Sequence, residues 1–132
     1  MINLIKLRTK NEIMVISKIL GIIGILFIET VTATVYNAVP EQTDSTPFIT
    51  ASGARIDKNH PELHRWVAVS QDMLKRGYKF GMRIEVSGAG DLDGIWEIQD
   101  VMNVRYTNCI DFLVENTRKL GKWNNVKIKL IT

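Results

Sequence analysis

Short segments with the composition of β-strands recur along the chain from about residue 30 to its last residues. They are rich in β-branched and aromatic residues or alternate apolar with polar positions, and turn-forming residues follow most of them. Alternation of this kind buries one face of a strand and exposes the other. The pattern predicts strands at residues 30–39, 47–51, 66–69, 79–86, 95–100, 110–114 and 125–131.

Helical patterns in the chain are short. Residues 70–77, SQDMLKRG, predict one helical turn with Ser70 as its N-cap and a glycine at its end, and residues 115–120 predict another. Residues 58–64 predict a turn or a single irregular helical turn. None of these segments is long enough for the crossover that joins parallel strands in an α/β fold. The fold class is therefore predicted to be all-β, with small helices inserted into a compact barrel of about six strands.

The start of the chain differs from the rest. A polar and basic beginning is followed by residues 13–28, IMVISKILGIIGILFI, an apolar run that Lys18 divides. This order is typical of a secretory signal, so we expect an exported protein of the periplasm or cell envelope. The uninterrupted part, residues 19–28, is shorter than the roughly 20 residues that cross a bilayer.

A cleavage site after this leader is poorly defined. The small residues at positions 31–33 offer one, but cutting there would trim the first predicted strand. An uncleaved N-terminal membrane anchor is therefore the alternative to a removed signal. The length of the rest is that of one domain. We place the leader at residues 1–30 and the barrel domain at residues 31–132.

Charge gives little indication of a partner outside the leader. The formal net charge is +3, and four of the 17 basic residues but only two of the 14 acidic ones lie in residues 1–30. The body is thus nearly neutral and lacks the basic surface of a nucleic-acid-binding protein. We expect it to be a monomer, with contact to a membrane only through an uncleaved leader.

The strongest candidates for chemistry lie in residues 94–114, GIWEIQDVMNVRYTNCIDFLV. Asp100 closes one alternating run and Asp111 begins a hydrophobic one, with Asn103 and Asn108 in the polar loop between them. A carboxyl group that is partly desolvated by apolar neighbours has a raised pKa, which suits a general acid. The alternative, which the local pattern by itself favours, is that both aspartates only cap turns at strand ends.

Other motifs predict neither a metal nor a cofactor. The glycines at 88, 90 and 94 lie in a turn with acidic residues, which would repel a phosphate group. His60 and His64 are four residues apart, but Pro61 between them argues against a helical metal pair.

Cys109 is the single cysteine, so no disulfide can form within the chain. Its position near Asp111 allows a nucleophile, but a small buried side chain is the favoured interpretation. The three tryptophans are expected in the core, although one exposed ring could stack on a sugar.

Six segments, taken together, resemble a known family. In order they read VTATVYNA, ITASG, WVAVSQDML, FGMRIEV, WEIQDVMN and IDFLV. They resemble the three-aspartate (3D) domain, which belongs with the double-psi β-barrels of murein lytic transglycosylase A, RlpA-like proteins and expansins. The resemblance covers residues 31–131 and is most specific at Asp100 and Asp111, on either side of the polar loop. It implies a six-stranded double-psi β-barrel.

The resemblance also implies roles for individual residues. In the lytic transglycosylases of this group the later aspartate is the catalytic acid/base, which would be Asp111 here. The earlier aspartate supports the site, which would be Asp100. Thr50, in the segment TASG, is similar to a threonine of the family's substrate groove.

Two departures from the family pattern affect these roles. Where the family has its first aspartate, directly after the strand VAV, this chain has Ser70, with Asp72 two places on. The family's glycine pair after the middle aspartate is replaced by Val101 and Met102. The first departure bears on the three-aspartate set, and the second on the shape of the loop at the site.

These observations give a hypothesis for function. A lytic transglycosylase cleaves peptidoglycan glycan strands without water: one carboxyl group protonates the glycosidic oxygen and then takes the proton of the sugar's own 6-hydroxyl, which closes a 1,6-anhydro ring. Asp111 would be the acid/base and Asp100 its support. The residues expected to contact the substrate are Thr50, Asn103, Asn108 and Asp72. The alternative is a peptidoglycan- or polysaccharide-binding module without catalysis, and a third possibility, a soluble interaction domain, would leave the leader unexplained.

Overall fold

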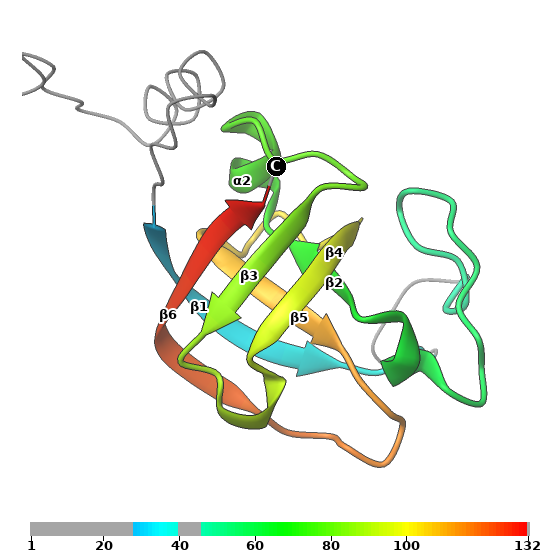
Figure 1. The fold of residues 1–132 in the computed structure, drawn as a ribbon. Coiled ribbons are helices and arrows are strands. Elements are labelled where there is room, and N and C mark those ends of the chain that lie inside the picture. Colours follow the sequence, from blue (N-terminus) through cyan, green and yellow to red (C-terminus); the bar gives the residue numbers. More distant parts are fainter. Residues whose placement is uncertain (1–27, 40–45, 132) are drawn as a thin grey trace, which may run out of the picture.

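The structure is a computed structural model that describes residues 28–39 and 46–131, so the expectations for residues 1–27 lie outside it. The described chain forms a closed six-stranded barrel with one short helix and two 3-10 turns (Figure 1). The elements in chain order are β1 (Ile28–Tyr36), η3 (Pro61–His64), β2 (Trp66–Val69), α2 (Gln71–Lys75), β3 (Arg83–Ser87), η4 (Gly90–Leu92), β4 (Gly94–Val101), β5 (Cys109–Leu113) and β6 (Lys122–Ile131).

The strands close the barrel in the order β1-β5-β2-β4-β3-β6. β1 is parallel to β5 and β2 is parallel to β4, while the other neighbours are antiparallel. If β1 is exchanged with β4, β2 with β5 and β3 with β6, the same closed order and the same parallel and antiparallel pairs result. The barrel therefore consists of two interlocked halves of three strands each. The predicted all-β, six-stranded double-psi β-barrel is confirmed. Parallel pairs form without long crossover helices because other strands lie between the two partners in sequence and provide the return path.

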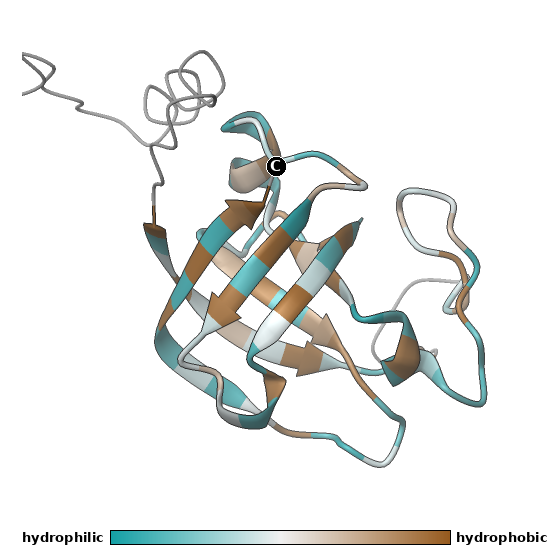
Figure 2. Cartoon of the chain, in the orientation of Figure 1, coloured by the Kyte–Doolittle hydropathy of each residue, from teal (hydrophilic) through white to brown (hydrophobic). Residues whose placement is uncertain are grey.

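Alternation along the strands separates an inner from an outer face, visible as alternating brown and teal residues on β3 and β6 (Figure 2). The inner face holds fully buried side chains, among them Ile98, Ile110, Phe112 and Ile128. Trp96 packs on Phe112 with their ring centroids 4.6 Å apart, and its indole N–H donates to the carbonyl oxygen of Leu92 at 2.7 Å. The tryptophan thus fills the core and satisfies its polar atom.

The other two tryptophans are only partly buried. Trp123 packs against the core and meets Phe112 edge-on. Trp66 lies outside the barrel, stacked on the His64 ring with the centroids 3.9 Å apart. The expectation of core tryptophans therefore holds fully for Trp96 and partly for these two.

Two predicted elements are wrong. Residues 47–51 form no strand, apart from an isolated bridge between Ile49 and Arg55, because the chain turns back on itself at Gly53 with φ +90°. Residues 115–120 form a turn instead of a helix. There the Asn37 side chain donates to the carbonyl oxygens of Glu115 and Arg118, so a side chain takes the backbone acceptors that a helix would use.

The remaining elements match the pattern with shifted ends. Strand 66–69 is as predicted, and the helical turn after it is α2, with Ser70 at the N-cap position. The Ser70 hydroxyl does not cap the helix but accepts from the backbone N–H of Cys109 at 3.0 Å. Strand β5 begins two residues before Asp111, so Asp111 lies inside a strand and not at its head.

The barrel begins earlier than the predicted boundary at residue 31. β1 starts at Ile28, and its first residues pair with β6. Glu29 is buried, accepts from the Tyr78 hydroxyl and forms an ion pair with Arg76. A cut at residues 31–33 would therefore remove a paired and buried part of the barrel. Within residues 28–39 and 46–131, no helix is long and apolar enough to cross a membrane.

Candidate active site

Strand register places the two aspartates in one row across the outer face of the barrel. Thr34 of β1 lies opposite Asp111 of β5, Asp111 lies opposite Ala68 of β2, and Ala68 lies opposite Asp100 of β4. Neighbouring strands are about 4.8 Å apart, so the Cα atoms of Asp111 and Asp100 are roughly 10 Å apart. The small side chain of Ala68 lies between them and leaves the space above the row open.

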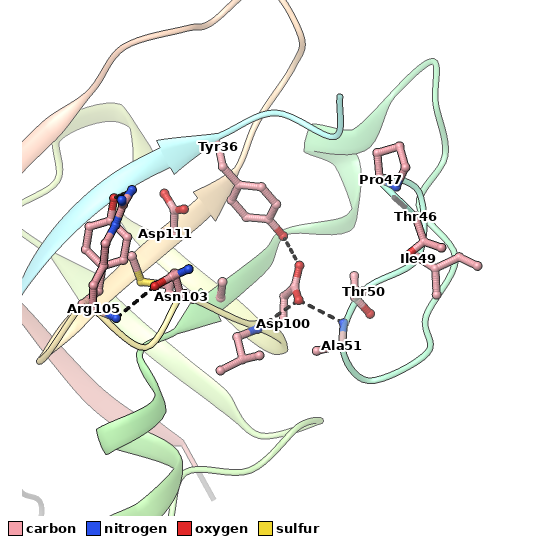
Figure 3. A pocket seen from close by; sticks show the side chains of 14 residues that line it. Tyr36, Thr46, Pro47, Ile49, Thr50, Ala51, Asp100, Asn103, Arg105 and Asp111 are labelled. Atoms are coloured by element: carbon pink, nitrogen blue, oxygen red, sulfur yellow. Dashed lines mark hydrogen bonds between the residues drawn. The ribbon is translucent and has the colours of Figure 1, made fainter. Parts of the chain in front are cut away.

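This row forms the floor of a groove with a volume of about 750 Å³. Loop residues 46–51 form one side and residues 101–106 the other, and both aspartates open between them (Figure 3). The residues that line the groove are Tyr36, Thr46, Pro47, Ile49, Thr50, Ala51, Ala68, Asp100, Val101, Met102, Asn103, Arg105, Tyr106 and Asp111. Four of the six predicted site residues, namely Asp111, Asp100, Thr50 and Asn103, therefore share one groove.

Asp111 has the environment of a carboxyl group that titrates near neutral pH. Its Oδ1 accepts a hydrogen bond from the Thr34 hydroxyl at 2.7 Å. Burial raises the pKa of Asp111 to about 6, the Thr34 hydroxyl opposes this rise, and the charge of Asp100 adds to it. Near pH 6 the group can therefore both give and take a proton.

Asp100 is engaged on both of its oxygens. Oδ2 accepts from the Tyr36 hydroxyl at 3.0 Å, while Oδ1 accepts from the backbone N–H groups of Ala51 and Val101, each at 2.9 Å. Burial, together with the adjacent Asp100, raises the pKa of Tyr36 well above its usual value, so the phenol keeps its proton and remains a donor. These bonds make Asp100 the link between β4, β1 and the loop above the groove.

Loop 46–57 is held over the barrel by polar and apolar contacts together. The Thr50 hydroxyl is buried, accepts from the backbone N–H of Ala54 at 3.1 Å and lies 2.8 Å from the Ser52 hydroxyl. Ile56 belongs to a second apolar cluster outside the barrel, and Phe48 packs against it. The buried members of this cluster are Tyr36, Ala38, Ile56, Ala68, Met102 and Leu113. Thr50 thus shapes the loop, and its hydroxyl is already engaged within it.

The opposite side of the groove is a tight turn. The Asn103 side-chain oxygen accepts from the backbone N–H of Arg105 at 3.0 Å, and the Asn103 carbonyl oxygen accepts from the N–H of Tyr106 at 3.0 Å. An asparagine that binds the backbone two residues on is an Asx turn. The turn directs Arg105 and Tyr106 toward the groove.

Tyr36, Arg105 and Tyr106 are among the lining residues that the sequence pattern did not single out. Tyr36 reads as one more aromatic residue of a strand, and its bond to Asp100 joins residues 64 positions apart. For Arg105 a local signal existed, because an asparagine such as Asn103 in a loop between two strands favours an Asx turn.

The two other predicted site residues, Asp72 and Asn108, lie outside the groove lining. The Asp72 carboxylate accepts from the backbone N–H of Asn108 and forms an ion pair with Arg76 at 2.8 Å. The Asn108 amide donates to the carbonyl oxygen of Thr30 at 2.9 Å, and its backbone has φ +53°. These contacts join α2, the end of the loop before β5, and β1. The positions of both residues favour a structural role over direct substrate contact.

Cys109 is not activated as a nucleophile. Burial, with the charge of Asp72, raises the pKa of its thiol, and the thiol donates to the carbonyl oxygen of Thr107 at 3.1 Å. His64 Nε2 accepts from the backbone N–H of Asp57, which ties it to the nearby loop. No group of three or more His, Cys, Asp or Glu residues in the described part of the chain is arranged to hold a metal ion.

Comparison with known proteins adds no relative: no family model, no curated protein and no solved structure matches the chain.

Proposed function

We propose that this protein is an exported enzyme that cleaves peptidoglycan glycan strands as a lytic transglycosylase, with Asp111 as the acid/base. The observation that carries the proposal is the Asp111 carboxyl group, half-buried in an open groove, with a pKa of about 6. A general acid is most effective when its pKa lies close to the working pH. The resemblance to the three-aspartate domain supplies the substrate class.

The proposed step needs one carboxyl group. Protonated Asp111 gives its proton to the glycosidic oxygen as the bond to the anomeric carbon breaks. The resulting Asp111 carboxylate then takes the proton of the 6-hydroxyl of the same sugar, whose oxygen bonds to the anomeric carbon. Protons and electron pairs balance without water, and the strand ends in a 1,6-anhydro sugar.

The bonding of Asp100 favours this mechanism over ordinary hydrolysis. A hydrolase needs a second carboxylate, as a nucleophile or as a base for water. Asp100 already accepts three hydrogen bonds from Tyr36, Ala51 and Val101, which hold its oxygens toward the protein. Its role in the proposal is to place the loop and, through its charge, to keep the pKa of Asp111 raised.

The test compares Asp111→Asn with Asp100→Asn on purified sacculi, with released products measured by mass spectrometry. We expect the unmodified chain to release anhydro-muropeptides. Asp111→Asn should still bind sacculi but turn over slower by a factor on the order of 10² to 10⁴, the usual contribution of a general acid. Asp100→Asn should lose less, because Asp100 does not handle the proton.

Each alternative has its own outcome. Normal turnover by folded Asp111→Asn would refute the acid/base role. Products heavier by one water would indicate hydrolysis. A chain that pellets with sacculi but releases nothing would be the non-catalytic binding module. An unchanged melting temperature of each variant at pH 4, where the Asp111 carboxyl is protonated, shows that lost activity is not lost fold.

A further inference from the structure

The lining of the groove contains one cationic side chain among the residues that the structure describes, Arg105. It lies beside Asn103 on the opposite side of the aspartates from Thr50 and Ala51 (Figure 3). Asp111 and Asp100 are the acidic residues of the same lining. The groove therefore has an electrostatic direction, with carboxyl groups on its floor and a guanidinium at one side.

The Arg105 side chain is held in place by the side chain of Tyr106, its neighbour in the sequence. Its Nη2 donates to the Tyr106 hydroxyl at 2.9 Å, and the guanidinium lies over the Tyr106 ring, 4.9 Å from the centroid. The Asx turn at Asn103 fixes the backbone that carries both side chains. A guanidinium oriented in advance loses less rotamer entropy when it binds an anion.

Most of the hydrogen-bonding capacity of Arg105 is free for a ligand. A guanidinium has five N–H donors, and among the described residues that of Arg105 makes only the bond to Tyr106. No carboxylate of the described chain forms an ion pair with it. Arg118 and Arg76, by contrast, are each paired with an aspartate.

We propose that Arg105 binds a carboxylate carried by the glycan, so that the groove selects acidic glycan strands over neutral ones. This rests on the proposed function and narrows its substrate to strands with a free carboxylate close to the bond above Asp111. The planar fork of arginine matches a carboxylate with two parallel hydrogen bonds, which gives orientation as well as affinity. Binding the carboxylate at Arg105 would also keep that negative charge away from Asp111 and Asp100.

The experiment measures binding of two matched probes. One is soluble glycan strands prepared from sacculi by removing the stem peptides, which leaves a lactyl carboxylate on the strand. The other is the same strands with these carboxylates converted to amides. Both are titrated into the full chain carrying Asp111→Asn, which keeps the strands intact, and into the same chain with Arg105→Gln, Arg105→Lys or Arg83→Gln added.

We expect the carboxylated strands to bind about 10-fold tighter than the amidated ones, the effect of one charge-assisted hydrogen-bonded pair at a solvated site. Arg105→Gln should remove this preference, and Arg105→Lys should restore part of it, because the charge returns without the fork. Arg83→Gln removes the same charge from β3, none of whose residues lines the groove, and should keep the full preference.

The outcomes separate this inference from the proposed function. Equal binding of both probes, or a preference that survives Arg105→Gln, overturns the carboxylate site, while cleavage of sacculi through Asp111 would still stand. A chain that neither binds the strands nor cleaves sacculi overturns both proposals.

Discussion

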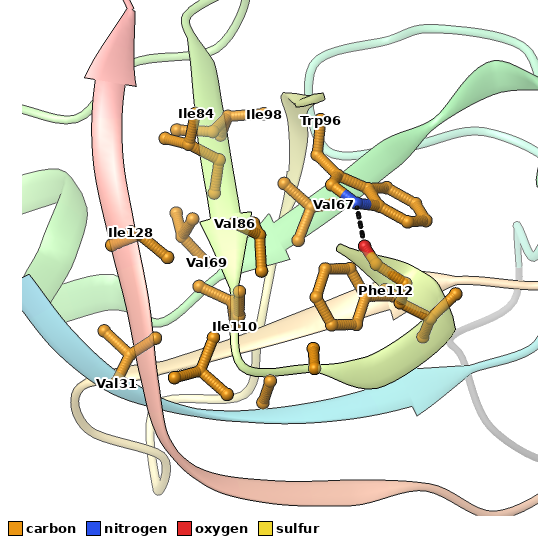
Figure 4. Packing of buried hydrophobic residues seen from close by; sticks show 14 of the residues in the cluster. Val31, Val67, Val69, Ile84, Val86, Trp96, Ile98, Ile110, Phe112 and Ile128 are labelled. Atoms are coloured by element: carbon orange, nitrogen blue, oxygen red, sulfur yellow. Dashed lines mark hydrogen bonds between the residues drawn. The ribbon is translucent and has the colours of Figure 1, made fainter. Parts of the chain in front are cut away.

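The inner and outer faces of the same strands have different roles in this barrel: one forms the hydrophobic core and the other carries the groove. On β5 the inward residues Ile110 and Phe112 lie fully buried against Trp96 and the other strands (Figure 4). Asp111, between them in sequence, points outward into the groove. One-residue alternation thus places a titratable acid directly behind fully buried core residues, whose packing holds the strand in place.

The two faces also satisfy their requirements differently. The inner face is stabilised by removing apolar surface from water, which needs no particular partner. The outer face holds polar groups that each need a hydrogen-bond partner. Asp111 accepts from the Thr34 hydroxyl, and Asp100 accepts from the Tyr36 hydroxyl and the backbone N–H of Ala51. Core substitutions should therefore change stability at every pH, whereas substitutions in the groove should change pH dependence and activity.

The largest expected effect on stability comes from emptying the inner face. Phe112→Ala should lower the free energy of unfolding by about 3–5 kcal/mol, because the lost side chain leaves a cavity under Trp96. Urea denaturation measures it, and Ile49→Ala, at a residue that is 43% exposed, serves as the control with little change. A loss below about 1 kcal/mol for Phe112→Ala would contradict the packing described for this face.

A smaller effect, confined to one pH range, is expected at Asp111. Its folded-state pKa of about 6 lies above that of an unfolded aspartate, so the wild type loses stability as the pH rises from about 4 to about 6. The asparagine of Asp111→Asn does not titrate. The free energy of unfolding of this variant, relative to that of the wild type, should therefore be higher at pH 7.5 than at pH 4 by up to about 3 kcal/mol. Urea denaturation at the two pH values measures this gain. Equal differences at both would mean that the carboxyl group is not desolvated.

The smallest effect is expected from the hydroxyl beside Asp111. Thr34→Val keeps the shape and removes the donor that holds the pKa of Asp111 down, so that pKa should rise further. In a plot of cleavage rate against pH, the rate falls as Asp111 loses its proton. This fall should move to higher pH in Thr34→Val, while the rate at low pH should change little. Thr32→Val, at a β1 residue that lines no part of the groove, is the matched control. An unmoved profile for Thr34→Val would indicate that another group sets it.

The sequence by its own pattern located the strands of the barrel, because the signal of a strand is local. Alternation within each strand and the turn residues between strands are written in neighbouring positions, and they located the six barrel strands to within a few residues. The same local pattern made Asp100 and Asp111 candidates, since each stands beside a hydrophobic run, and the resemblance to the three-aspartate domain supplied their expected roles. The local pattern was wrong at residues 47–51 and 115–120, where backbone groups bind partners outside the segment.

The assembly of the groove depends on contacts between residues far apart in the sequence. Strand register brought Thr34 to Asp111 and Tyr36 to Asp100, residues 77 and 64 positions apart, and no local pattern carries such a distance. The fold also joins Asp72, in α2, to Asn108, just before β5, away from the groove lining, although both lie close in sequence to groove residues. The pKa of Asp111 belongs to the same level. The apolar neighbours of Asp111 in the sequence indicated desolvation, but the loop and strands around it produce the burial. Only the fold places Thr34 where its hydroxyl opposes the rise in the pKa of Asp111.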